Sequence, residues 1–154
     1  AVEKILGKRL LEKGLTLGTA ESCTGGNIAH QITSVAGSSL YFNGSVVSYA
    51  NEAKVNVLHV SQESLQQFGA VSEAVSIEMA RGAQRVLNVD CSIATTGIAG
   101  PDGGTEDKPV GPVWICTTYK DKYVAKKYQL GKFREANIMR ASNNALLQLL
   151  DMLD

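Results

Sequence analysis

Hydrophobic and polar residues alternate with two different periods along this chain. Apolar residues three and four positions apart are typical of amphipathic helices, and short continuous apolar runs are typical of buried strands. Leu146, Leu149, Leu150 and Leu153 give the clearest helical stripe. The pattern predicts helices at about residues 2–13, 24–33, 51–58, 61–68, 72–87 and from 134 onward.

The residues at the ends of these segments support the predicted helices. Gly14 is placed to end the first helix, since glycine readily takes the left-handed conformation of a helix C-cap. Ser61 and Ser72 are suited as N-caps, because a serine hydroxyl can accept a hydrogen bond from the first helical turn. Asn51 is expected to cap the short helix that carries Lys54.

Strands are predicted at about residues 15–20, 46–49, 90–96, 110–118 and 123–129. The last two flank the polar stretch Lys120–Lys122, which predicts a β-hairpin. Because strands alternate with helices early and a hairpin comes late, we expect one three-layer α/β/α domain over residues 1–154. Its sheet is expected to be mixed and mostly parallel.

Composition and charge narrow the class of protein. Fifteen basic and fifteen acidic side chains cancel, so the net charge gives no reason to expect a nucleic acid or membrane partner. No apolar run approaches the roughly 20 residues that span a bilayer, and no signal peptide is visible. Three widely spaced cysteines without a CxxC motif favour a reducing, cytoplasmic compartment. Two histidines without metal-binding spacing predict no metal site.

The segment 19–26 concentrates reactive groups between a predicted strand and a predicted helix. It places a carboxylate, hydroxyls and a thiol ahead of two glycines, in Glu21, Ser22, Thr24, Cys23, Gly25 and Gly26. The glycines let a ligand approach the backbone, and the N–H groups of the new helix favour an anion there. Ser22 and Thr24 could instead be simple helix caps, but a cap needs only one of these side chains.

A second glycine-rich loop, at residues 97–104, follows another strand, so the two loops are expected to be walls of one small-molecule site. Backbone N–H groups near Thr96 and Gly97 could form an oxyanion hole, and the Thr96 hydroxyl could bind substrate. Gly100 could allow close approach to a ribose or phosphate. Arg134 at a helix start is unfavourable for the helix dipole, which favours an anion-binding role.

Two residues are candidates for nucleophile and base. Cys23 could attack as a thiolate, but His30 and His59 are not placed to assist it, and a small buried side chain is the better interpretation. Lys54 is the remaining candidate for a base. Its pKa of about 10.4 must then fall, through burial or a nearby arginine. A solvated lysine on a helix surface is the alternative from the residues alone.

Four motifs in a fixed order carry a resemblance to a known family. They are TAESCTGG, AGSS with FNGSVVSYANEAK, GAVSE, and TTGIAGPDGG with KPVG. Together they closely resemble the C-terminal domain family of the competence/damage-inducible protein CinA, whose stand-alone members are nicotinamide-mononucleotide (NMN) deamidases. The resemblance covers the whole chain and implies the same three-layer architecture.

The resemblance also implies a mechanism. Family members are serine amidohydrolases with a Ser/Lys pair, which implies hydrolysis of NMN to nicotinic acid mononucleotide and ammonia in pyridine-nucleotide recycling, without a cofactor. Residue by residue, Ser39 is expected as nucleophile, Lys54 as base and Tyr49 as its orienting or proton-relay partner. Ser22 is the rival nucleophile.

The resemblance leaves binding and assembly as broader expectations. The substrate phosphate is expected near Thr24, Gly25 and Gly26 or at Arg134, with Glu21 among the binding residues. A homo-oligomer, with a dimer favoured, is expected as well. A nucleotide-binding interaction module without turnover, linked to competence or the response to DNA damage, is the alternative function.

Overall fold

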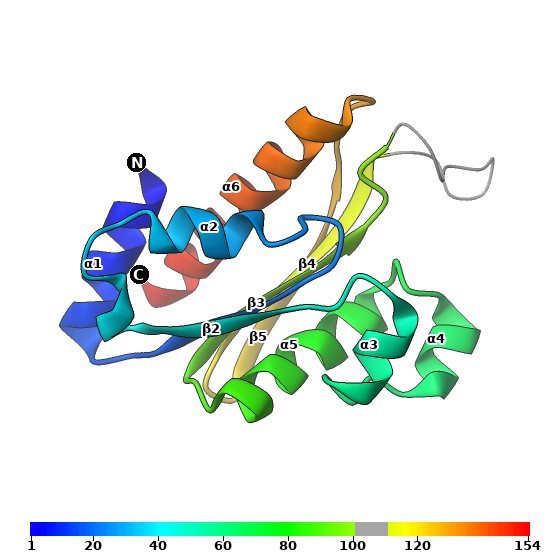
Figure 1. The fold of residues 1–154 in the computed structure, drawn as a ribbon, viewed down its shortest axis with the longest axis horizontal. Helices are drawn as coiled ribbons and strands as arrows, with labels where there is room; N and C mark the ends of the chain where they lie inside the picture. The colour runs from blue at the N-terminus through cyan, green and yellow to red at the C-terminus, as the bar shows by residue number, and fades with distance from the viewer. Residues whose placement is uncertain (101–110) are drawn as a thin grey trace.

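The computed structural model describes residues 1–100 and 111–154 (Figure 1). In chain order its elements are α1 (Val2–Lys13), β1 (Leu17–Glu21), α2 (Asn27–Thr33), the 3-10 turn η1 (Ser38–Leu40), β2 (Phe42–Val47), α3 (Asn51–Asn56), α4 (Gln62–Phe68), α5 (Glu73–Leu87), β3 (Cys91–Gly97), β4 (Pro112–Tyr119), β5 (Lys122–Gln129) and α6 (Arg134–Leu153). None of the described helices combines the length and apolar character that a bilayer span requires.

The strands form one mixed sheet in the order β2-β1-β3-β4-β5. β1 pairs in parallel with both β2 and β3, whereas β4 pairs antiparallel with β3 and with β5. The parallel part therefore comes from the alternating strands and helices, and the antiparallel part comes from the late hairpin. Both features were expected from the sequence, and the three-layer α/β/α fold is confirmed.

Helices cover both faces of the sheet (Figure 1). α1, α2 and α6 lie over one face, and α3, α4 and α5 lie over the other. Along β3 the side chains alternate between two cores, because neighbouring residues of a strand point to opposite faces. Ile93 packs in the core with α1, α2 and α6, whereas Ala94 packs with α5.

Several predicted boundaries need correction. β2 begins at Phe42, four residues before the predicted strand, because pairing with β1 holds Asn43 and Gly44 extended despite their low strand propensity. α2 begins at Asn27 and not at Thr24, since residues 22–26 form a turn.

The predicted serine caps are confirmed, whereas the asparagine cap is wrong. Ser61 accepts a hydrogen bond from the backbone of Ser64 at 3.1 Å, and Ser72 from that of Val75 at 3.2 Å. Asn51 is the first residue of α3, and Ala50 is its N-cap without a side-chain bond. The chain enters α3 from a strand end, so the capping position falls one residue earlier than the residue type suggested.

The segment after α3 lies directly on α5. A Cβ atom added to Gly82 would lie 2.2 Å from the carbonyl oxygen of Leu58. Arg85, one turn later, donates to the same carbonyl at 3.4 Å, and the Val60 N–H donates back to the Lys54 carbonyl at 3.0 Å. The absence of a side chain at Gly82 therefore lets the segment that carries Lys54 rest against the layer below.

We expect Gly82→Ala to destabilise the fold by about 2 kcal/mol, because overpacking against a backbone carbonyl outweighs the roughly 1 kcal/mol by which alanine normally favours a helix. Gly7→Ala in α1 is the matched comparison. Its Cβ would meet the phenol end of the buried Tyr41 and not a backbone carbonyl, and because a side chain can shift further than hydrogen-bonded backbone, its cost should be smaller. Urea unfolding of both variants measures the difference. A Gly82→Ala protein as stable as the wild type would contradict this packing.

Candidate functional site

A cavity of about 230 Å³ opens where β1, β2 and β3 end at their carboxyl ends. This is the edge at which open α/β sheets place ligands. The cavity is lined by Ser22, Cys23, Tyr49, Asn51, Lys54, Ala70, Val71, Thr96, Gly97, Ile98, Ala99 and Arg134. Five segments of the chain, after β1, after β2, between α4 and α5, at the end of β3 and at the start of α6, thus meet at one point.

Lys54 is the central cation of this cavity. Its side chain comes from α3 and is only 1% exposed. The Nζ atom lies 3.1 Å from Ser22 Oγ, 3.0 Å from the Ser48 carbonyl oxygen and 3.3 Å from the Tyr49 carbonyl oxygen. All three of these neighbours are uncharged, and no carboxylate among the described residues forms an ion pair with Lys54.

Burial lowers the pKa of Lys54 from its ordinary value, since the charged ammonium loses its hydration. A thiolate at the adjacent Cys23 would raise the Lys54 pKa again. Burial, however, raises the pKa of Cys23 itself to about 12, so this residue is a neutral thiol near neutral pH. The lowering therefore prevails for Lys54, and Cys23 has the character of a packing residue.

Ser39 is not part of this cavity. It is exposed and belongs to η1, which precedes β2, whereas Lys54 follows the opposite end of the same strand. The six residues of β2 separate these ends by roughly 20 Å at 3.3 Å per residue. The structure thus corrects the expected pairing of Ser39 with Lys54, and Ser22 holds the position next to the amine. The residue-by-residue match with the family had pointed to Ser39, but a whole strand lies between Ser39 and Lys54.

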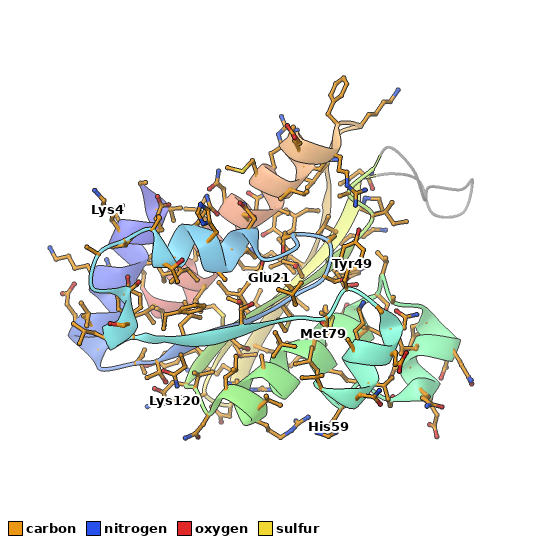
Figure 2. The ribbon with its side chains drawn as sticks, in the orientation of Figure 1. Lys4, Glu21, Tyr49, His59, Met79 and Lys120 are labelled. Carbon is orange, nitrogen blue, oxygen red and sulfur yellow. The ribbon has the colours of Figure 1, made fainter. Side chains whose placement is uncertain are left out.

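Glu21, expected to bind substrate, has a different position. Its carboxylate is fully buried beneath α2 at the end of β1 (Figure 2). Oε1 accepts from the N–H groups of Gly26 at 3.2 Å and Ile28 at 3.0 Å, and Oε2 accepts from that of Ala29 at 2.9 Å. The donors of the α2 N-terminus are therefore occupied by a carboxylate of the chain itself. This corrects the expectation that they bind a substrate phosphate.

Thr24, Gly25 and Gly26 likewise shape the turn and do not line the cavity. The Thr24 hydroxyl donates to Glu21 Oε1 at 2.7 Å and lies 2.9 Å from the Thr95 hydroxyl. Gly25 and Gly26 have φ angles of 60° and 99°, which favour glycine. These three residues therefore hold Ser22 in place and are not ligand contacts in this arrangement.

The wall formed by the end of β3 agrees in part with the sequence analysis. Thr96 and Gly97 both line the cavity. The Thr96 hydroxyl donates to the Ala70 carbonyl at 2.8 Å, so it fixes the loop between α4 and α5 and is not free for a ligand. A Cβ on Gly97 would lie 2.5 Å from the Pro112 carbonyl oxygen, so this glycine serves the pairing with β4. The predicted loop residues 101–104 lie outside the described residues.

Tyr49 and Arg134 meet at the mouth of the cavity. Arg134 donates from Nη2 to the Tyr49 hydroxyl and from Nη1 to the Gly100 carbonyl, both at 2.7 Å. The Tyr49 side chain is 59% exposed and lies at the end of β2 (Figure 2). Tyr49 thus touches Lys54 through its carbonyl oxygen and Arg134 through its phenol. The expected proton relay through its side chain has no contact with Lys54 in this arrangement.

Some residues of the site were not found by sequence reasoning. Asn51, Ala70 and Val71 line the cavity, and the last two belong to the GAVSE motif that had been noted only for the resemblance. Asn137 lies behind the wall as a buried amide within α6. A single asparagine in a helical pattern gives no signal by itself. Among the described residues, no group of His, Cys, Asp or Glu side chains could hold a metal ion.

Comparison with known proteins assigns the chain to a family and supports its fold. The sequence model described as the CinA C-terminal domain matches residues 1–153, so the chain belongs to that family. A CinA-like protein of Flavobacterium psychrophilum is 51% identical over 145 residues, which are 94% of this chain and 35% of the relative. The chain therefore spans about a third of the length of that curated relative.

Solved structures give the same architecture. A CinA superfamily protein from Klebsiella pneumoniae 700603, described as competence-damaged protein, matches with a TM-score of 0.95 and 34% identity, covering 99% of this chain and 95% of that one. The competence/damage-inducible protein CihA from Agrobacterium tumefaciens matches with a TM-score of 0.93 and 36% identity, covering 100% and 97%. The resemblance stated from the motifs is thereby confirmed at the level of the family.

Glu21→Ala should lower the free energy of unfolding by about 3 kcal/mol, because it leaves buried N–H groups at the α2 N-terminus without acceptors. Glu12→Ala, at an exposed position of α1, is the control and should stay within about 0.5 kcal/mol of the wild type. Chemical denaturation followed by circular dichroism measures both. Equal stability of the two variants would mean that Glu21 does not cap α2.

Proposed function

We propose that this chain is an amidohydrolase that converts NMN and water to nicotinic acid mononucleotide and ammonia, in the recycling of pyridine nucleotides. The observation that carries the proposal is the buried contact between Lys54 Nζ and Ser22 Oγ at 3.1 Å. Membership in the CinA family supports the choice of substrate, since stand-alone members are NMN deamidases.

The surroundings of Lys54 suit a general base. A neutral amine has two N–H donors and one lone pair. The carbonyl oxygens of Ser48 and Tyr49 can only accept, so they take the two N–H groups. The lone pair is then directed to the third neighbour, Ser22 Oγ, whose hydroxyl can donate. Because burial lowers the Lys54 pKa, the neutral form that this arrangement needs is more accessible than in an exposed lysine.

The reaction follows from this pair. Ser22 Oγ attacks the carboxamide carbon while Lys54 takes the hydroxyl proton. Lys54 then delivers that proton to the leaving nitrogen, the C–N bond breaks and ammonia departs. Water, deprotonated by Lys54, attacks the resulting ester, and the proton returns to Ser22 as the acid is released. The base therefore serves twice, and no cofactor enters.

The developing oxyanion needs donors close to Ser22. The backbone N–H groups of Cys23 and Thr24 follow it on the same turn and donate to no other described residue. The N–H of the residue after a nucleophile is a common member of an oxyanion hole. We therefore assign the oxyanion to this turn, in preference to the amides near Thr96.

The phosphate of the substrate is assigned to Arg134. Among the described residues, this guanidinium donates only to neutral acceptors, the Tyr49 hydroxyl and the Gly100 carbonyl. Arg134 is also the first residue of α6, whose N-terminus has no side-chain cap. An arginine beside uncapped backbone N–H groups suits a phosphate, whereas the α2 N-terminus is already occupied by Glu21.

Ser22→Ala and Lys54→Ala should each lower kcat by about 10³-fold or more, and the double variant should be little worse, because the two groups act as one unit. Ser39→Ala, a serine outside the cavity, is the matched control and should keep near wild-type turnover. Ammonia release from NMN, in the presence of a metal chelator, is measured for the four purified variants and for the wild type.

A trapped acyl-enzyme identifies the nucleophile independently, because the modified peptide contains either Ser22 or Ser39. Full activity of Ser22→Ala, or a label on Ser39, would refute the assignment. NMN binding by the wild-type protein without any release of ammonia would favour a nucleotide-binding module in place of an enzyme.

The pH profile of kcat/KM tests Lys54 as the base. Only the neutral amine can accept the Ser22 proton, so activity should be low at acidic pH and rise through the pKa of Lys54. Since burial lowers that pKa, the midpoint of the rise should lie below the ordinary lysine value of 10.5. Steady-state kinetics over a pH series in buffers of constant ionic strength measures this profile. A rate that falls as pH rises through neutrality would exclude a neutral lysine as the active form.

A further inference from the structure

Asn137 joins two backbone segments behind the cavity wall. It lies in α6 and is only 1% exposed. Its Nδ2 atom donates to the carbonyl oxygens of Ala99 and Gly131, both at 2.7 Å, and its Oδ1 atom accepts from the Gly131 N–H at 3.0 Å. Both N–H groups and the carbonyl of this amide are therefore used, so its orientation is fixed.

Arg134 holds the neighbouring carbonyl of the same segment. It lies three residues before Asn137 and therefore on the same side of α6. Its Nη1 atom donates to Gly100, the residue after Ala99. Two consecutive carbonyls of the chain leaving β3 are thus bound by two side chains from the first turns of one helix. No other side chain among the described residues donates to either carbonyl.

This segment is part of the cavity. Ile98 and Ala99 line it directly, and the Ile98 backbone pairs with the start of β4 through the Pro112 carbonyl at 3.0 Å and the Gly111 N–H at 2.8 Å. At Ala99 and Gly100, the hydrogen bonds from α6 fix where the backbone lies. The position of the Gly100 carbonyl in turn decides where the Arg134 guanidinium lies, because one of its two described hydrogen bonds ends there.

We propose that Asn137 is a positioning residue for the substrate phosphate. Its amide fixes the Ala99–Gly100 backbone on α6, and this backbone holds Arg134 at the mouth of the cavity. The inference rests on the proposed function for the identity of the anion. Asn137 lies behind the wall and is not a lining residue, so it acts through Arg134 and not by contact with NMN.

Gln148 provides a matched control. It is a second buried amide of α6, 4% exposed, and it donates to the carbonyl oxygens of Ile115 and Val124 at 3.1 and 3.0 Å. It differs in location, since it lies 11 residues further along the helix, over the β4–β5 hairpin. A variant of either residue removes a buried amide from the same helix, but only Asn137 is connected to the cavity.

The kinetic test compares Asn137→Ala, Asn137→Asp and Gln148→Ala. We expect both Asn137 variants to raise KM for NMN about tenfold with kcat within about twofold, the effect of one weakened hydrogen bond to a charged group. Asn137→Asp keeps the size and the acceptor but loses the two donors, so it should not restore the wild-type KM. Gln148→Ala should leave KM unchanged. Equal KM values for all variants, or an equal rise in Gln148→Ala, would overturn the positioning role.

Amide hydrogen exchange of the ligand-free proteins tests the contact without relying on turnover. Exchange at residues 98–100 and Gly111 should be faster in Asn137→Ala than in the wild type and unchanged in Gln148→Ala. Unchanged exchange in Asn137→Ala would overturn the inference even if NMN is hydrolysed. If exchange is faster in Asn137→Ala and the wild-type protein releases no ammonia from NMN, the proposed function is refuted and the role of Asn137 in the wall remains.

Discussion

The arrangement of the site depends on one buried carboxylate. Glu21 ends β1 and accepts hydrogen bonds from the first N–H groups of α2 and from Thr24. Removing a carboxylate from water is costly, and these donors compensate for it together with the hydroxyls of Thr19 and Ser45. The consequence is a rigid turn between strand and helix. That turn places Ser22 toward Lys54 and leaves the α6 N-terminus, with Arg134, as the better position for an anion.

Lys54 shows the opposite solution for a buried charge. Its neighbours are a hydroxyl and two carbonyl oxygens, so burial is not offset by a counter-charge. The cost of burial appears as a lowered pKa of Lys54, which favours the neutral amine. A buried amine without an ion-pair partner suits the role of general base that we propose for Lys54. An ion pair would stabilise the ammonium and keep the amine protonated.

The sequence was sufficient for the fold, and it named Ser22 and Lys54, which the structure brings into contact. Periodicity and caps located α1, α4, α5 and the hairpin, because these elements obey local rules. It was not sufficient to pair Ser22 with Lys54, since that contact depends on the parallel pairing of β1 with β2 and on which end of β2 each loop leaves. The role of Asn137 could not be predicted from the sequence for a similar reason. Its partners Ala99 and Gly131 lie 38 and 6 residues earlier in the chain.

The order of the elements along the chain has a consequence for synthesis on the ribosome. Among the described elements, those that carry Ser22 and Lys54 are made before α5, which supports Lys54. Arg134 and Asn137 lie at the start of α6, the last of the described elements, which packs between α1 and the strands β3 and β4. The two residues in contact and the two residues at the start of α6 are therefore made at different times. The site becomes complete only when α6 has left the exit tunnel and docked.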